Sequence, residues 1–93
     1  MSKATVWFMD ARSRRFLEST AIKGRQILEY SGWLDHLKPG DIVAVKTHMG
    51  EAYNVGYLRP VIVRTFVDAL KEQGCKPFVT DTTTMPYHPW ISR

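Results

Sequence analysis

Hydrophobic residues fall into three short runs that are typical of buried β-strands. The runs cover residues 6–9 (Val-Trp-Phe-Met), 42–45 (Ile-Val-Ala-Val) and 78–80 (Phe-Val-Thr), and a polar residue follows each of them. Continuous apolar runs rich in β-branched and aromatic side chains indicate strands that are covered on both faces. We therefore predict three strands, of which residues 42–45 form the clearest.

Two longer segments between these runs carry apolar residues at helical spacing. Residues 15–30 form the first segment, where Gly24 lies on the apolar stripe and predicts a close contact with a sheet. The second segment begins at Pro60, a residue favoured in the first turn of a helix, and Gly74 is its expected end. The two stripes consist of Phe16, Leu17, Ala21, Gly24, Ile27 and Leu28, and of Ile62, Val63, Phe66, Val67 and Leu70.

The order strand, helix, strand, helix, strand predicts an α/β fold with a short parallel sheet, a Rossmann-like half domain of two or three layers. We expect residues 1–93 to form a single α/β domain and an incomplete N-terminal part of a larger one. Strand orders 1-2-3 and 2-1-3 both leave exposed edges and apolar surface. The chain is therefore expected to form a homo-oligomer or to lack a C-terminal half.

Charge and composition narrow the classes of partner. The formal net charge of +4 favours anionic partners. Arg12, Arg14 and Arg15 form the one dense basic cluster, but no nucleic-acid-binding motif accompanies them, so we do not expect nucleic acid as the partner. The sequence has neither an apolar run of membrane-spanning length nor a signal-peptide core, which predicts a cytoplasmic location without membrane contact. Cys75 is the single cysteine, so we expect no disulfide and no iron–sulfur cluster held within this chain.

Polar residues collect where the predicted strands end, which is the edge where open parallel sheets bind their ligands. Lys46 and His48 follow the second strand, and Asp81 follows the third. We predict His48 and Glu51 as catalytic acid–base groups, because imidazole titrates near neutral pH and a carboxylate can orient it. The predicted substrate is a small anion. Its predicted binding residues are Lys46, Asn54, Arg59, Asp81, Thr82 and Thr83.

The same residues also have structural interpretations that the sequence leaves open. Lys46 can extend past the strand end, and Glu51 can pair with Arg59. Asp81 and the threonines after it can cap a turn. His48 and Glu51 lack an identifiable third metal ligand, so no metal ligands are assigned. Dinucleotide, P-loop and nucleophile-elbow motifs are missing.

Several motifs together resemble the domain-of-unknown-function family 362, whose members are commonly labelled uncharacterised iron–sulfur centre proteins. The core is Lys-Thr-His-Met-Gly-Glu at 46–51, followed by Asn54, Tyr57, Leu-Arg-Pro at 58–60 and Thr-Asp-Thr-Thr-Thr at 80–84. Residues 6–12 resemble the family's N-terminal strand, and the family's Asp-Thr-Asn-Thr is Asp-Thr-Thr-Thr here. Family members are usually several times longer, and many carry clustered cysteines.

The resemblance implies the N-terminal α/β part of a redox-associated protein, with any iron–sulfur cluster in a longer form or a partner. It supplies no established reaction. The expected function is therefore an anion or metal site at the strand ends. The alternative is a non-enzymatic module that binds a small anion or assembles into an oligomer.

Overall fold

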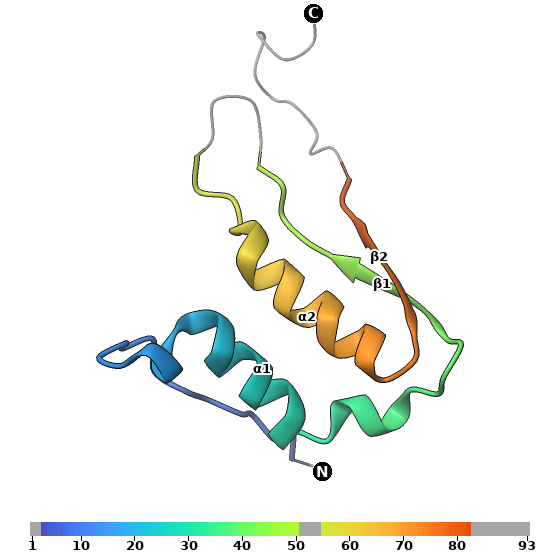
Figure 1. Ribbon diagram of the computed structural model, residues 1–93, viewed down its shortest axis with the longest axis horizontal. Coiled ribbons are helices and arrows are strands. Elements are labelled where there is room, and N and C mark those ends of the chain that lie inside the picture. The colour runs from blue at the N-terminus through green and yellow to red at the C-terminus, as the bar shows by residue number, and fades with distance from the viewer. Residues whose placement is uncertain (1–2, 51–54, 83–93) are drawn as a thin grey trace, which may run out of the picture.

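The computed structural model describes residues 3–50 and 55–82, which form two helices beside a two-stranded sheet (Figure 1). Helix α1 spans Thr20–Tyr30 and helix α2 spans Pro60–Glu72. Strand β1 spans Ile42–Lys46 and strand β2 spans Lys76–Thr80. Short 3-10 turns lie at Phe16–Glu18 and Trp33–His36. The structure confirms the predicted α/β class.

The two strands are parallel, as predicted, and α2 is the connection between them. Their register pairs Ile42 with Lys76 and continues to Lys46 with Thr80. Parallel strands need such a crossover, because the end of the first strand and the start of the second lie at opposite edges of the sheet. The carboxyl ends of β1 and β2 therefore lie at the same edge of the sheet.

The predicted strand at residues 6–9 is wrong, because this segment is irregular in the structure. Lys23 of α1 donates hydrogen bonds to the carbonyl and carboxylate oxygens of Asp10, at 2.9 and 3.0 Å, and to the Arg12 carbonyl. These bonds hold the segment beside α1. We call residues 3–9 the N-terminal arm.

The layers follow one another in the order sheet, α2, α1, since α2 packs on both strands and α1 packs on α2 (Figure 1). Gly24 permits the contact between the helices: a Cβ atom there would lie 3.4 Å from Cζ of Phe66. The predicted contact of Gly24 with a sheet is therefore wrong, because α2 lies in between. Arg25 of α1 adds an ion pair with Glu72 of α2.

Helix α2 begins at Pro60 and ends just before Gly74, the two residues that the sequence indicates as its limits. Pro60 stands at its start, where the N–H group that proline lacks would have no partner within the helix. After its last turn, Gly74 has a φ of 87°, and the N–H of Cys75 donates to the Leu70 carbonyl at 3.0 Å. This is a Schellman ending, which needs glycine at the left-handed position.

Helix α2 covers only one face of the sheet. Its residues Ala69 and Leu70 are buried, and Val43 and Val45 of β1 are half-buried beneath it. Ile42 and Phe78 remain exposed. Within the described residues the core is therefore confined to the contact of α2 with the sheet and α1.

Candidate functional site

The loops after β1 and β2 are joined by one ion pair. Nζ of Lys46 lies 2.6 Å from Oδ1 of Asp81 and also donates to the carbonyl of Thr47. The Asp81 carboxylate accepts two further bonds at 2.8 Å, from the backbone N–H groups of Met49 and Thr82. The sequence places these residues 35 positions apart, and the parallel sheet brings them together as predicted.

The Asp81 carboxylate has three hydrogen-bond donors among the described residues. Its side chain is only 11% exposed. The hydrogen bond from Lys46 holds the pKa of Asp81 well below its usual range, and the N–H groups of Met49 and Thr82 add to this effect. Asp81 is therefore ionised at neutral pH, and it compensates much of the charge that Lys46 would offer to an anion.

A hollow of about 450 Å³ lies beside this ion pair, between the strand ends and the first half of α2. We call it the strand-end hollow. Its lining is mainly apolar, and four of its residues carry a polar group on the side chain: Thr47, His48, Tyr57 and Arg64. The complete lining is Thr47, His48, Met49, Tyr57, Leu58, Pro60, Val63, Arg64, Val67 and Val79.

Thr47 contributes a buried hydroxyl group that lacks a hydrogen-bond partner among the described residues. Side chains alternate along an extended strand, so Thr47 points to the same side as Val43 and Val45, toward α2. A buried hydroxyl without a partner costs free energy. Such an atom at the wall of a hollow is consistent with a ligand group that accepts or donates a bond there.

The predicted site residues of the described ranges lie in more than one place. His48 lines the strand-end hollow, whereas Lys46 and Asp81 form the neighbouring ion pair. Arg59 precedes α2 and lines a different hollow, together with Ser13 and Ser19 near the start of α1. Among the described residues, Arg59 and His48 therefore line different hollows, and a shared site for all the predicted residues stays a prediction.

Three of the predicted site residues lie outside the described residues, and one cationic residue that lines the strand-end hollow was not predicted. Glu51, Asn54 and Thr83 lie outside the described residues. Thr82 contributes its backbone N–H to Asp81. Arg64 lines the hollow, and its position four residues after Pro60, on the same helical face, is the signal that would have indicated it.

The described residues hold no cluster of three or more His, Cys, Asp or Glu side chains that could bind a metal ion. Over the same ranges, 3–50 and 55–82, no helix combines the length and the apolar character needed to cross a membrane.

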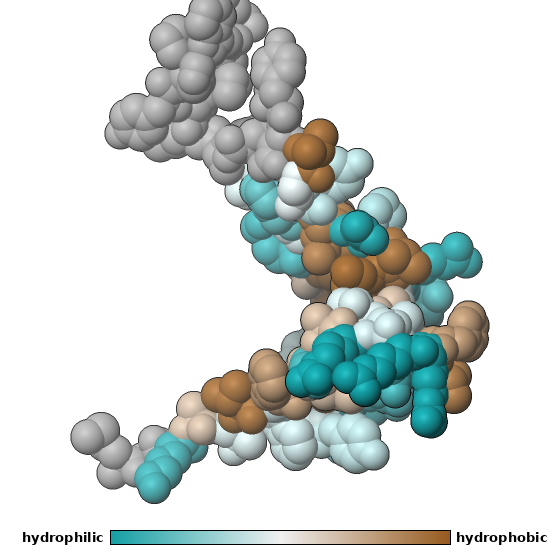
Figure 2. Space-filling view, turned by 90° about the vertical axis from the view of Figure 1, so that its left-hand side faces the viewer, coloured by the Kyte–Doolittle hydropathy of each residue, from teal (hydrophilic) through white to brown (hydrophobic). Residues whose placement is uncertain are grey.

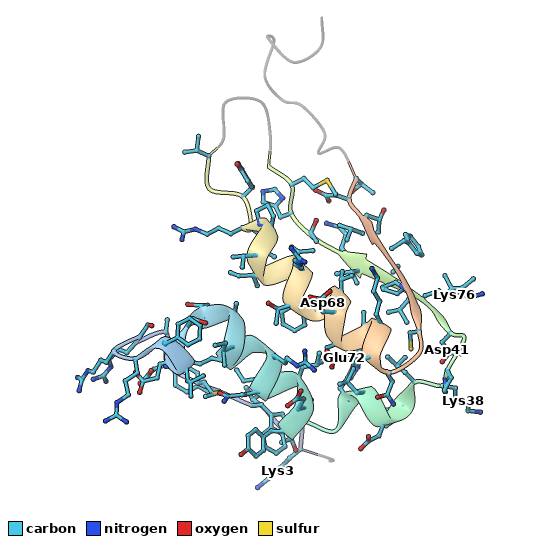
Figure 3. The ribbon with its side chains drawn as sticks, viewed as in Figure 1. Lys3, Lys38, Asp41, Asp68, Glu72 and Lys76 are labelled. Carbon is cyan, nitrogen blue, oxygen red and sulfur yellow. The ribbon has the colours of Figure 1, made fainter. Side chains whose placement is uncertain are left out.

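Charged residues at the opposite edge of the sheet have a structural role. Figure 3 shows Lys38, Asp41 and Lys76 near one another where the strands begin. The Asp41 carboxylate accepts the backbone N–H of Lys38 at 2.8 Å, which closes the turn before β1. The charged residues of this edge therefore belong to a turn, and the candidate site lies at the other edge.

Comparison with known proteins gives one match. The family model described as Domain of unknown function (DUF362) matches residues 43–92, which is more than half of the chain and includes every residue that lines the strand-end hollow. The match begins in β1, so residues 6–12 lie outside it. The searches of curated proteins and of solved structures return no match. The chain therefore belongs to the DUF362 family, described as a domain of unknown function.

Proposed function

We propose that this chain binds a small organic anion in the strand-end hollow. The observation that carries the proposal is the composition of the hollow: an apolar lining with His48 and Arg64 in it and the unpartnered hydroxyl of Thr47 at its wall. Small-molecule sites combine an apolar cavity with a few polar groups in this way.

The lining indicates which parts such a ligand has. Apolar walls from Leu58, Val63 and Val67 favour an apolar body, such as an aromatic ring or a short alkyl chain. Arg64 supports a negative charge at one end of that body. Its side chain is 82% exposed, and Nε lies 3.7 Å from the Asp68 carboxylate, a loose contact that leaves guanidinium donors available.

The ion pair beside the hollow makes Lys46 a weaker anion-binding group than Arg64. Because Lys46 already pairs with Asp81, an anion would have to compete with a carboxylate for it. His48 is exposed and lines the hollow, and it stays our candidate for proton transfer if a reaction occurs there. The contribution of Glu51 and Asn54 stays a prediction.

An iron–sulfur cluster does not fit the ligands that this chain provides. Such clusters are held mostly by several cysteine thiolates. The chain has one cysteine, Cys75, which is buried with its sulfur 3.6 Å from the Lys38 carbonyl. We therefore propose that any cluster associated with this protein is bound by other residues, in a longer form or in a partner.

Binding of 8-anilinonaphthalene-1-sulfonate, an apolar aromatic anion, tests the proposed site. In a titration followed by ¹H–¹⁵N correlation spectra, we expect the largest shifts at the amides of His48, Met49 and Leu58, which surround the hollow. Shifts centred instead on Ile42 and Phe78 would show that the probe binds the exposed sheet face and would contradict the proposal.

A pair of matched variants on α2 separates the hollow from other apolar surfaces. Val67→Phe places a ring in the hollow, whereas Val61 lies on another side of the same helix and lines the hollow that contains Arg59. We expect Val67→Phe to weaken binding at least about tenfold, equivalent to about 1.4 kcal/mol. Val61→Phe should leave it nearly unchanged. Equal affinity of the two variants would refute the assignment.

A further inference from the structure

The outer edge of β1 offers backbone groups that have no partner strand among the described residues. The Asp41 carbonyl and the Thr47 N–H both bond to β2, at 2.7 and 3.0 Å. The N–H and C=O groups of one residue in a strand point the same way, and this direction alternates along the strand. Ile42, Ala44 and Lys46 therefore direct their backbone groups away from β2, toward an edge where the described residues include no further strand.

The outer edge of β2 is different, because proline occupies it. The same alternation turns Lys76, Phe78 and Thr80 toward β1, so Pro77 and Val79 face the other edge. Proline has no N–H to donate, and its presence on an edge strand discourages the addition of another strand. The two edges are therefore unequal, and the β1 edge is the one that can accept a strand.

An apolar groove of about 280 Å³ runs along the β1 edge. We call it the β1 groove. Five consecutive residues, 43–47, line it. Because successive side chains point to opposite faces, a continuous series of this kind means that the groove follows the edge of the strand itself. Its other walls come from α1, α2 and their flanking turns, with Leu28, Trp33, Leu58, Val63, Phe66 and Leu70.

The N-terminal arm has the sequence of a strand and exposes one apolar side. Val6 and Phe8 are each 85% exposed, whereas the alternate residues Trp7 and Met9 are 49% and 38% exposed. Figure 1 shows α1 and α2 between the arm and the two strands, so the arm cannot reach the β1 groove of its own chain without leaving α1. Figure 2 shows exposed apolar surface at the lower left of the molecule, next to less apolar surface along the bottom.

We propose that the β1 groove of one chain binds the N-terminal arm of a second copy of this chain as an added strand. The arm keeps its Lys23 contacts and its covered side on its own α1, and it inserts Val6 and Phe8 into the groove of the neighbour. Two chains that exchange arms reciprocally form a closed dimer with two-fold symmetry. The inference does not rest on the ligand proposed for the strand-end hollow, and the two hollows share Thr47, Leu58 and Val63 in their linings.

Side-chain direction and charge select a parallel orientation for the added strand. For Val6 and Phe8 to enter the groove, they must stand beside Val43 and Val45, whose side chains face α2. This register brings Lys3, which Figure 3 shows at the outer end of the arm, near Asp41 at the start of β1, and Asp10 near Lys46 at its end. An antiparallel strand would instead bring like charges together at both ends.

Two phenylalanine variants test the exchange by sedimentation velocity over micromolar to millimolar concentrations. Phe8 and Phe16 are 85% and 88% exposed, so replacing either one leaves the fold of the single chain nearly unaffected. We expect the wild-type chain to dimerise and Phe8→Asp to raise the dimer dissociation constant at least about tenfold, because a carboxylate would enter an apolar groove. Phe16→Asp should dimerise like wild type. A wild-type chain that stays monomeric, or equal effects of the two variants, would overturn the proposal.

Cysteine cross-linking between separately prepared chains distinguishes exchange from closure within one chain. In the proposed register Trp7 stands beside Ala44, so a mixture of Trp7→Cys chains and Ala44→Cys chains should form a disulfide between the two kinds of chain. Chains with a single substitution provide the background from Cys75. If a chain carrying both substitutions cross-links only within itself while the mixture does not react, the arm occupies its own groove, and a second copy is excluded as the occupant.

Discussion

The replacement Thr47→Val has opposite expected effects on stability and on binding. Valine keeps the shape of the side chain and removes the hydroxyl, which is buried and lacks a partner among the described residues. An unsatisfied buried polar group costs about 1–3 kcal/mol. We therefore expect the free energy of unfolding of the variant to exceed that of wild type by about 1 kcal/mol, which raises the melting temperature of a domain of this size by about 4–8 °C.

Urea unfolding and probe titration, performed on the same samples, measure the two effects. If the hydroxyl serves a ligand, the more stable Thr47→Val chain binds the aromatic sulfonate more weakly than wild type. Thr47→Ser keeps the hydroxyl and loses a methyl group, so it should lose stability and retain binding. A Thr47→Val chain that is less stable than wild type would refute the reasoning, because it would show that the hydroxyl is hydrogen-bonded in solution.

Two further substitutions test the fold that positions the site. Gly24→Ala should stabilise the chain by about 0.5–1 kcal/mol in thermal unfolding, because alanine favours a helix and its Cβ meets Phe66 at a tolerable 3.4 Å; a lower melting temperature would contradict this contact. Asp81→Asn should make the chain less stable than wild type at any pH above the unfolded carboxyl pKa of about 3.9. This loss should shrink as pH falls toward the folded pKa, which is lower, because the wild-type carboxylate becomes protonated there. Urea unfolding over a pH series measures this difference, and a difference that is independent of pH would contradict the role of the carboxylate.

The elements around the site could be predicted from sequence because their signals are local. Residues 42–45 already contain most of β1, and Pro60 and Gly74 mark the limits of α2. The contact of Lys46 with Asp81 followed from the rule that parallel strands end at the same edge. These inferences needed only periodicity and topology.

The remaining features depend on contacts that a linear pattern does not contain. An apolar run such as residues 6–9 indicates a strand, but pairing requires an accessible partner edge, and here Lys23 holds the adjacent Asp10 beside α1 instead. The directions of Arg59 and Arg64 depend on how α2 is rotated against the sheet. The charge balance between Lys46 and Asp81 likewise depends on a distance of 2.6 Å.

Pro77 limits how far association of this chain can extend. A fibre built by stacking sheets edge to edge needs every chain to accept a neighbour on both sides. Here the outer edge of β2 lacks the backbone donor at Pro77, which disfavours growth through that edge. If the β1 edge pairs with a second copy as proposed, Pro77 would keep the assembly small and finite, and a residue with a backbone N–H at position 77 would remove that protection against aggregation.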